Sequence, residues 1–136
     1  MRTPIISMYS PWANWVGLGW KTIETRTHDR FKSLVGKRIG IHKALKWDDD
    51  ALRIAAPYLT SIQQAARFGF LKVGGAICWT AYVKEHRRLC PCDAPAALIE
   101  CETERYGLLL EDVQTIEMIP CKGKQGIWYY DIPEAA

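Results

Sequence analysis

Three charged side chains occupy one short, β-prone segment near the N-terminus, and this segment constrains the fold more than any other. Lys21, Glu24 and Arg26 alternate with β-branched residues, directly after a glycine that ends a short helix predicted over residues 11–18. On an ideal strand Glu24 and Arg26 share one face, and Lys21 lies on the other. Buried charge is costly unless it is paired or lines a cleft. We therefore expect Glu24 and Arg26 to pair on a cleft-facing side, with Lys21 able to turn out of the preceding loop.

The same segment carries a signature, G-x-K-x-I-E-x-R, which is matched by Gly19, Lys21, Ile23, Glu24 and Arg26. In this signature the chain resembles ASCH domains, which belong to the PUA-like superfamily. SPWANWV at residues 10–16 is similar to a helix of the ASCH subgroup that includes the thyroid-receptor-interacting transcription coactivator. Residues 106–113 and 119–128 resemble the closing strands of stand-alone bacterial and phage ASCH proteins. These motifs reach both ends of the chain, so the resemblance covers nearly all of it.

The pattern of apolar segments agrees with the fold that the resemblance implies. That fold is α+β: a PUA-like mixed β-barrel of five to six strands with two or three flanking helices, in a single domain over residues 1–136. Periodicity predicts strands at residues 5–8, 21–26, 38–42, 75–86, 106–111, 113–118 and 126–131. After residue 47 it predicts two helices, over residues 49–56 and 60–68, separated at Pro57. Residues 87–104 are punctuated by proline and predict a long irregular connection.

Composition limits the class of protein and of partner. With 136 residues, of which 49% are apolar and 24% charged, the chain can bury the core of one globular domain. A net charge of +3 permits a nucleic-acid partner without requiring one. No apolar run approaches the roughly 18 residues of a membrane span, and the N-terminus has no signal-peptide pattern. We expect a cytoplasmic protein with no membrane partner.

A cleft around the charged segment is the candidate binding site, and several polar and aromatic residues are expected to line it. Lys21 and Arg26 would contact a phosphate or a carbonyl, and Glu24 would accept hydrogen bonds from a base edge or orient Arg26. Either Trp12 or Trp128 would stack on a base. The full set of expected ligand-binding residues is Ser10, Trp12, Lys21, Glu24, Arg26, His42, Lys43, Lys122, Lys124, Gln125 and Trp128.

Structural explanations exist for the same residues. Trp12 and Trp15 fall on one helical face, as two core residues would. The charged segment can be interpreted as a set of ion pairs on the surface. The lysines of residues 119–128 suit a solvated hairpin loop. The partner that the resemblance implies is RNA, single-stranded nucleic acid or a modified nucleoside, with no cofactor.

An enzyme is the alternative hypothesis. In the ASCH-type acetylcytidine amidohydrolases a lysine at this motif position is the proposed nucleophile, assisted by a threonine three residues later and by a glutamate from another loop. Lys21 matches that lysine, but Glu24 occupies the threonine position. The candidate catalytic residues are therefore Lys21 and Glu24, with Glu111 as another possible proton carrier, acting on a modified nucleoside or on RNA. A protein-interaction module is a third hypothesis.

The remaining motifs favour no metal and no common hydrolase or dehydrogenase class. His86, Cys90, Cys92 and Cys101 have metal-ligating side chains, but the Cys-x-Cys spacing is tighter than that of ordinary zinc knuckles. We predict no metal site and expect the five cysteines to be reduced thiols. The chain has no P-loop, G-x-S-x-G, H-E-x-x-H or dinucleotide-binding pattern.

Overall fold

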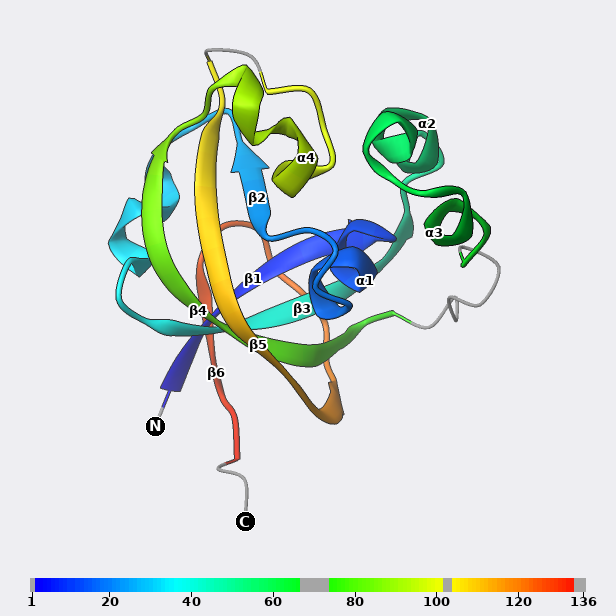
Figure 1. The fold of residues 1–136 in the computed structure, drawn as a ribbon. Helices are drawn as coiled ribbons and strands as arrows, with labels where there is room; N and C mark the ends of the chain where they lie inside the picture. The colour runs from blue at the N-terminus through cyan, green and yellow to red at the C-terminus, as the bar shows by residue number, and fades with distance from the viewer. Residues whose placement is uncertain (1, 67–73, 102–103, 134–136) are drawn as a thin grey trace.

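A strongly curved, mixed six-stranded sheet forms the body of the protein in the computed structural model, which describes residues 2–66, 74–101 and 104–133 (Figure 1). In chain order the strands are β1 (Arg2–Ser10), β2 (Ile23–Arg26), β3 (Arg38–Trp47), β4 (Ala76–Arg88), β5 (Tyr106–Pro120) and β6 (Trp128–Asp131). Their order in the sheet is β2-β5-β4-β3-β1-β6. The β1–β3 pair is parallel and the other neighbouring pairs are antiparallel.

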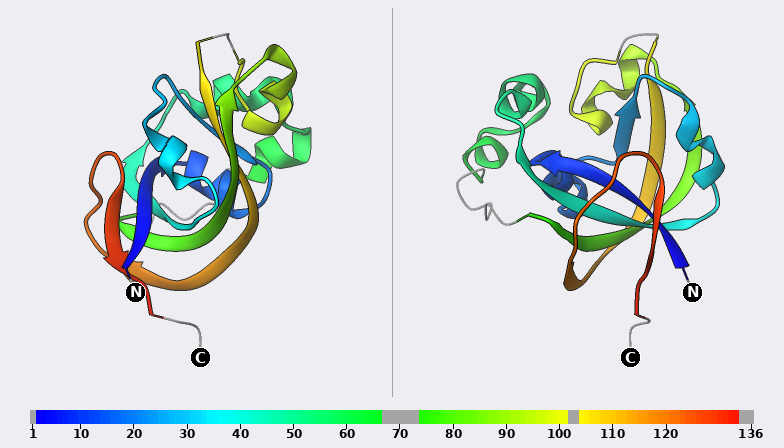
Figure 2. Two further views of the ribbon diagram at one scale, coloured as in Figure 1. Left: turned by 90° about the vertical axis from the view of Figure 1, so that its left-hand side faces the viewer. Right: turned by 180° about the vertical axis from the view of Figure 1, so that it is seen from behind.

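The sheet curls around its core without closing, as the two views of Figure 2 show. The α+β class and the six strands agree with the sequence prediction, whereas the barrel is open because edge strand β2 does not pair with β1 or β6. A side chain spans part of this opening: Nη2 of Arg26 on β2 donates to the carbonyl oxygen of Ser7 on β1 over 3.3 Å. The opening places the charged segment beside β1.

Short helices lie around the sheet: α1 (Trp12–Gly17), α2 (Ala51–Ala55), α3 (Ser61–Ala65), α4 (Ala94–Ala97) and the 3₁₀ turns η1 (Arg30–Leu34), η2 (Ala56–Tyr58) and η4 (Pro91–Asp93). These four α-helices of the described residues exceed the predicted two or three. The extra one, α4, lies in the connection predicted to be irregular, and the predicted helix over residues 49–56 tightens into η2 at Pro57. None of the helices in the described part of the chain is long and apolar enough to cross a membrane.

The helix that follows η2 begins where the sequence predicted it. The Thr60 hydroxyl accepts a hydrogen bond from the Gln63 amide, and the Gln63 side chain accepts one from the Thr60 amide. This reciprocal capping satisfies two amides that a helix start leaves without partners. The predicted end of this helix at residue 68 lies outside the described residues.

Alternation along β2 and β5 divides the apolar side chains between two cores. Leu108 and Leu110 of β5 point into the curled sheet, where they pack with η1 through Phe31. Ile23 of β2 and Leu109 of β5 face outward, where α4 covers them. The sheet is therefore buried on both faces at β2, and the two faces hold different neighbours.

One correction concerns β5, for which the sequence predicted two strands. The structure has a single strand whose pairing with β4 shifts by one residue between the pairs Thr80–Gln114 and Tyr82–Glu111. Asp112 lies within this shift and has a φ of 48°, a left-handed conformation that aspartate adopts more readily than most residues. The extra residue makes a β-bulge, which bends the strand without ending it.

A second correction concerns the cysteines. Cys90 and Cys92 form a disulfide, because the turn of η4 brings their Cα atoms to 5.3 Å, within the range that a disulfide spans. Cys78, Cys101 and Cys121 are free thiols. The expectation that all five cysteines are reduced is therefore wrong for this pair.

Candidate functional site

A cavity of about 760 Å³ lies at the open side of the sheet, between β2, β1, α1 and the loop over residues 121–127. Segments from most of the chain contribute to its walls. The lining residues are Ser7, Met8, Tyr9, Trp12, Lys21, Glu24, Thr25, Arg26, His28, Arg30, Phe31, Asp48, Ile54, Ile99, Lys124, Gln125, Gly126 and Ile127. Its volume lies within the range of small-molecule sites.

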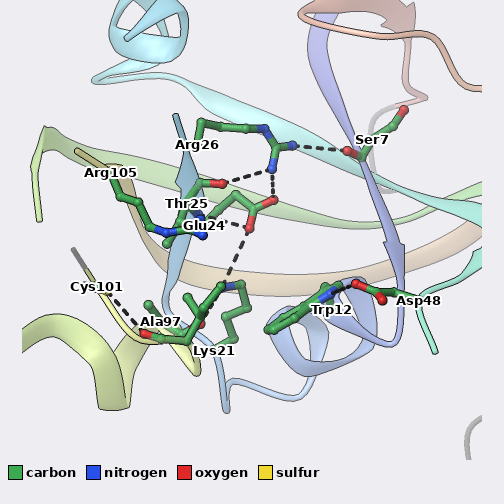
Figure 3. A network of polar contacts seen from close by, with 11 residues as sticks. Ser7, Trp12, Lys21, Glu24, Thr25, Arg26, Asp48, Ala97, Cys101 and Arg105 are labelled. Carbon is green, nitrogen blue, oxygen red and sulfur yellow. Dashed lines mark hydrogen bonds and ion pairs between the residues drawn. The ribbon is translucent and has the colours of Figure 1, made fainter. Parts of the chain in front are cut away.

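Lys21 lies in the cavity wall immediately before β2, and its side chain is almost wholly buried. Its Nζ atom donates to the carbonyl oxygen of Ala97 at 2.5 Å and lies 3.7 Å from Oε1 of Glu24 (Figure 3). The chain approaches this point because the amide of Thr22 also donates to α4, through the carbonyl oxygen of Ala96. Two contacts between the start of β2 and α4 thus fix the lysine.

Glu24 is the centre of the charged group. Its Oε2 accepts a hydrogen bond from Nη1 of Arg26 at 2.6 Å, and its Oε1 accepts one from the backbone amide of Thr25 at 3.2 Å (Figure 3). With Lys21 on the same oxygen, both carboxylate oxygens have partners. Glu24 therefore holds Lys21 and Arg26 in place, which matches the second of the two roles predicted for it. Lys21 and Glu24 are buried and Arg26 is partly buried, so the interpretation as a surface ion-pair set is wrong.

Burial and neighbouring charges alter the acid–base properties of this pair. Burial lowers the pKa of Lys21 to about 8, with Arg26 adding to the effect and Glu24 opposing it. Burial alone would raise the pKa of Glu24, but the charges of Arg26 and Lys21 outweigh it and lower that pKa below its usual value. At neutral pH the group is two cations around one carboxylate. Lys21 becomes neutral as the pH rises through about 8.

An aromatic wall stands beside the lysine. Nζ of Lys21 lies 5.0 Å from the centre of the Trp12 ring, a cation–π distance. The indole is held by Nε1, which donates to Oδ2 of Asp48 at 2.8 Å. Trp15, by contrast, is buried against α2, so only one of the two tryptophans of α1 is a core residue. Tyr9 adds a second, half-exposed ring to the cavity.

The structure brings together six of the eleven expected ligand-binding residues: Trp12, Lys21, Glu24, Arg26, Lys124 and Gln125. It does not place the other five in the cavity wall. Ser10 is buried at the end of β1 and donates to the carbonyl oxygen of Ala44, Lys43 is buried in β3, and Lys122 is exposed elsewhere on the loop.

His42 and Trp128 lie behind the loop over residues 121–127 and support it. Nε2 of His42 donates to the carbonyl oxygen of Cys121 at 2.9 Å, and Nε1 of Trp128 donates to the hydroxyl of Ser7 at 3.2 Å. That hydroxyl in turn donates to the carbonyl oxygen of Lys124. Both rings are therefore buried supports for the part of the loop that reaches the cavity, and Trp128 is not exposed for stacking.

Sequence reasoning missed several cavity residues, among them Tyr9, His28, Asp48, Ile54 and Ile99. Asp48 precedes α2, whose N-cap position is Asp50. Ile99 follows α4, in the connection that was predicted to be irregular. A signal existed only for His28, which lies in the basic stretch after β2.

The metal-ligating side chains of the sequence do not converge as a set. Cys90, Cys92 and Asp93 place one ligand atom each within 4.8 Å of one another. The two sulfurs are joined, however, and the Asp93 carboxylate accepts two hydrogen bonds from Arg87 at 2.8 Å. His86 instead stacks on Tyr106.

Comparison with solved structures identifies the architecture. The chain resembles the crystal structure of ASCH from Zymomonas mobilis (15% identity, TM-score 0.52). It also resembles the crystal structures of two point mutants of that protein, one tyrosine-to-phenylalanine and one serine-to-alanine (16% identity and TM-score 0.53 for each). The matches cover 87% of this chain and 73–75% of those chains. The sequence matches no family model and no curated protein. The chain therefore has the fold of an ASCH-domain protein, as its motifs predict.

Proposed function

We propose that the protein binds RNA or another single-stranded nucleic acid, or a modified nucleoside, by taking one base into the cavity beside Lys21. The observation that supports this most strongly is the Lys21–Glu24–Arg26 group, in which the nitrogen of Lys21 lies 5.0 Å from the centre of the Trp12 ring. It combines fixed hydrogen-bond donors with an aromatic surface, the two elements that recognise an unstacked base.

The donor that meets the base is Lys21. An ammonium group has three N–H donors. In Lys21 one of them is donated to the carbonyl oxygen of Ala97, and Glu24 forms an ion pair with the same nitrogen at 3.7 Å. A remaining donor would meet a carbonyl oxygen of a base bound in the cavity. Glu24 interacts with both cations and orients them beside the base.

The cavity rim suits the backbone of a nucleic acid. Arg30 and Lys124 both line the cavity, and both are exposed. Neither makes an ion pair among the described residues. Exposed cations at the mouth of an aromatic pocket are the usual contacts for phosphate oxygens.

Titration with nucleoside monophosphates and with a labelled eight-nucleotide RNA tests this proposal, with binding followed by tryptophan fluorescence and by anisotropy. Lys21→Met keeps the length of the side chain without its donors, and we expect it to weaken both ligands about ten-fold. Tyr129→Leu, on β6 away from the cavity, is the control and should bind as the wild type does. Wild-type protein that binds neither ligand, or a Lys21→Met variant that binds both unchanged, would contradict the proposal.

A hydrolase is the second candidate, and the lowered pKa of Lys21 favours it. At pH 8 about half of the side chain is the neutral amine, which can act as a nucleophile or a base. In the amide reaction the C–N bond breaks, the hydroxyl of water goes to the acyl carbon and its proton to the leaving nitrogen. Incubation with acetylcytidine and with RNA, resolved by chromatography beside Lys21→Met, decides: product lost in the variant supports an enzyme, and absence of product excludes these two substrates.

A further inference from the structure

A stacked group of side chains lies outside the cavity, at the end of the sheet next to α4. The rings of His86 on β4 and Tyr106 on β5 are 5.7 Å apart and almost parallel, with 10° between their planes. Arg88 lies over the same tyrosine ring at 5.4 Å, and its Nη2 donates to the tyrosine hydroxyl at 3.4 Å. His86 and Tyr106 are partly exposed and Arg88 is exposed. We name these three residues the outer stack.

Strand register shows that the outer stack and the cavity adjoin. Tyr106 is the direct partner of Arg26 in the β2–β5 pair and of Arg88 in the β4–β5 pair. Directly opposed residues of antiparallel strands have their side chains on the same face, about 5 Å apart. Arg26, Tyr106 and Arg88 therefore form one row across three strands, and the first member of this row lines the cavity.

A second link runs through the residues after β2. The guanidinium of Arg26 lies 5.1 Å from the centre of the Phe31 ring, and the ring of His28 contacts the edge of Phe31 at 5.2 Å. His28 and Phe31 line the cavity, and His86 lies near enough to His28 to influence its pKa, which burial lowers. Aromatic and guanidinium groups thus continue from the cavity to the outer stack.

We propose that the outer stack is a second nucleotide subsite, which binds the nucleotide adjacent to the one held in the cavity. A base stacks against the partly exposed His86–Tyr106 pair, and Arg88 contacts the phosphate that joins the two nucleotides. This inference rests on the proposed function and deepens it, because it assigns the cavity to one nucleotide of a nucleic-acid strand and not to a free nucleoside.

The chemistry of the outer stack supports this assignment over a purely structural role. Burial lowers the pKa of His86, with the charge of Asp29 opposing the effect and that of Lys32 adding to it, and a neutral imidazole stacks on a base without repelling Arg88. Arg88 interacts with Tyr106 and is close to the charge of Glu104, yet its guanidinium remains exposed. A planar guanidinium beside aromatic rings is a common arrangement in proteins that bind single strands.

The test compares a mononucleotide with an eight-nucleotide strand on the same set of variants. Tyr106→Leu keeps an apolar side chain but removes the stacking face, and Arg88→Gln removes the charge. Arg2→Gln and Tyr129→Leu are the matched controls, since Arg2 begins β1 and Tyr129 lies on β6, and neither lines the cavity nor belongs to the outer stack. Thermal melting of every variant shows that it is folded, and the strand is tested as RNA and as DNA of the same sequence.

We expect Tyr106→Leu to weaken strand binding about ten-fold and to leave mononucleotide binding unchanged. Affinity falls as salt concentration rises, and Arg88→Gln should make the slope of log affinity against log salt concentration less steep by about 0.7. This is the contribution of one phosphate contact on a single strand. Both results support the subsite. Stronger binding of RNA than of DNA would indicate a further contact, to the 2′-hydroxyl.

Four results would overturn the subsite, and they differ in whether the proposed function also fails. If the wild type binds both ligands and the two variants change neither, or if the strand binds no more tightly than the mononucleotide, only the subsite fails. If the variants weaken both ligands equally, they act through the cavity and the subsite fails again. If the wild type binds neither ligand, the proposed function fails together with it.

Discussion

The side-chain nitrogen of Lys21 lies 2.5 Å from the carbonyl oxygen of Ala97, a residue 76 positions later in the chain. This contact joins the start of β2 to the end of α4 and brings a buried cation to the cavity wall. It depends on Glu24, which lies within 3.7 Å and supplies the opposite charge. The two residues that the sequence marks as unusual are thus stabilised by each other and by a helix that its pattern does not predict.

Removing the carboxylate should destabilise the fold, because Lys21 and Arg26 would remain as neighbouring cations. We expect Glu24→Gln to lower the free energy of unfolding by about 3 kcal/mol, the usual cost of leaving buried charge without its partner. Lys21→Met in the same chain should recover part of that loss. Urea unfolding of both single variants and the double variant measures the coupling, and additive effects would show that the two residues act independently.

The pKa of Lys21 gives the free energy of unfolding a specific pH dependence. The folded protein releases this proton near pH 8, whereas the unfolded chain keeps it until its pKa of 10.5. Between these values the unfolded state binds more protons, so the contribution of Lys21 to the free energy of unfolding rises with pH. The difference between wild type and Lys21→Met, measured by urea unfolding from pH 7 to 10, isolates this contribution. A difference that stays constant across the range would show an ordinary pKa.

The charged centre of the site could be predicted from sequence because Lys21, Glu24 and Arg26 conflict with their β-prone surroundings, and that conflict is local. Beyond Trp12, Lys124 and Gln125, the rest of the wall could not be predicted, because it depends on contacts between distant segments. Ile99 reaches the cavity only through α4, and Asp48 only through its hydrogen bond to Trp12. No periodic pattern in either segment encodes such a contact.

The fold shows the same division between local and distant information. Strand periodicity predicts the α+β class and places the strands, since alternation between two faces is visible in the sequence. The single strand β5 could not be predicted, because the pattern breaks at Asp112 whether the strand bulges or ends. The open barrel depends on which edge strands pair, and this pairing is determined by contacts throughout the whole chain.

Binding and catalysis predict opposite pH dependences at the same lysine. If protonated Lys21 donates to a base carbonyl, affinity for the mononucleotide should fall as pH rises through about 8. If neutral Lys21 is a nucleophile or base, turnover of a substrate should rise over the same interval. Affinity and product formation measured from pH 6.5 to 9.5 separate the two proposals, and a flat profile for both would remove Lys21 from either role.

Gly123 sets the position of the loop that brings Lys124 and Gln125 to the cavity. A Cβ atom at this glycine would lie 2.5 Å from Cε1 of His42 and 2.8 Å from the hydroxyl of Ser7, closer than packed atoms allow. We expect Gly123→Ala to push the loop away from these two side chains, to cost about 1–3 kcal/mol of stability and to weaken strand binding. Lys122→Ala, an exposed neighbour, is the control and should preserve both properties. Unchanged melting and binding in Gly123→Ala would mean that His42 and Ser7 move aside, and that they do not fix the loop at the cavity.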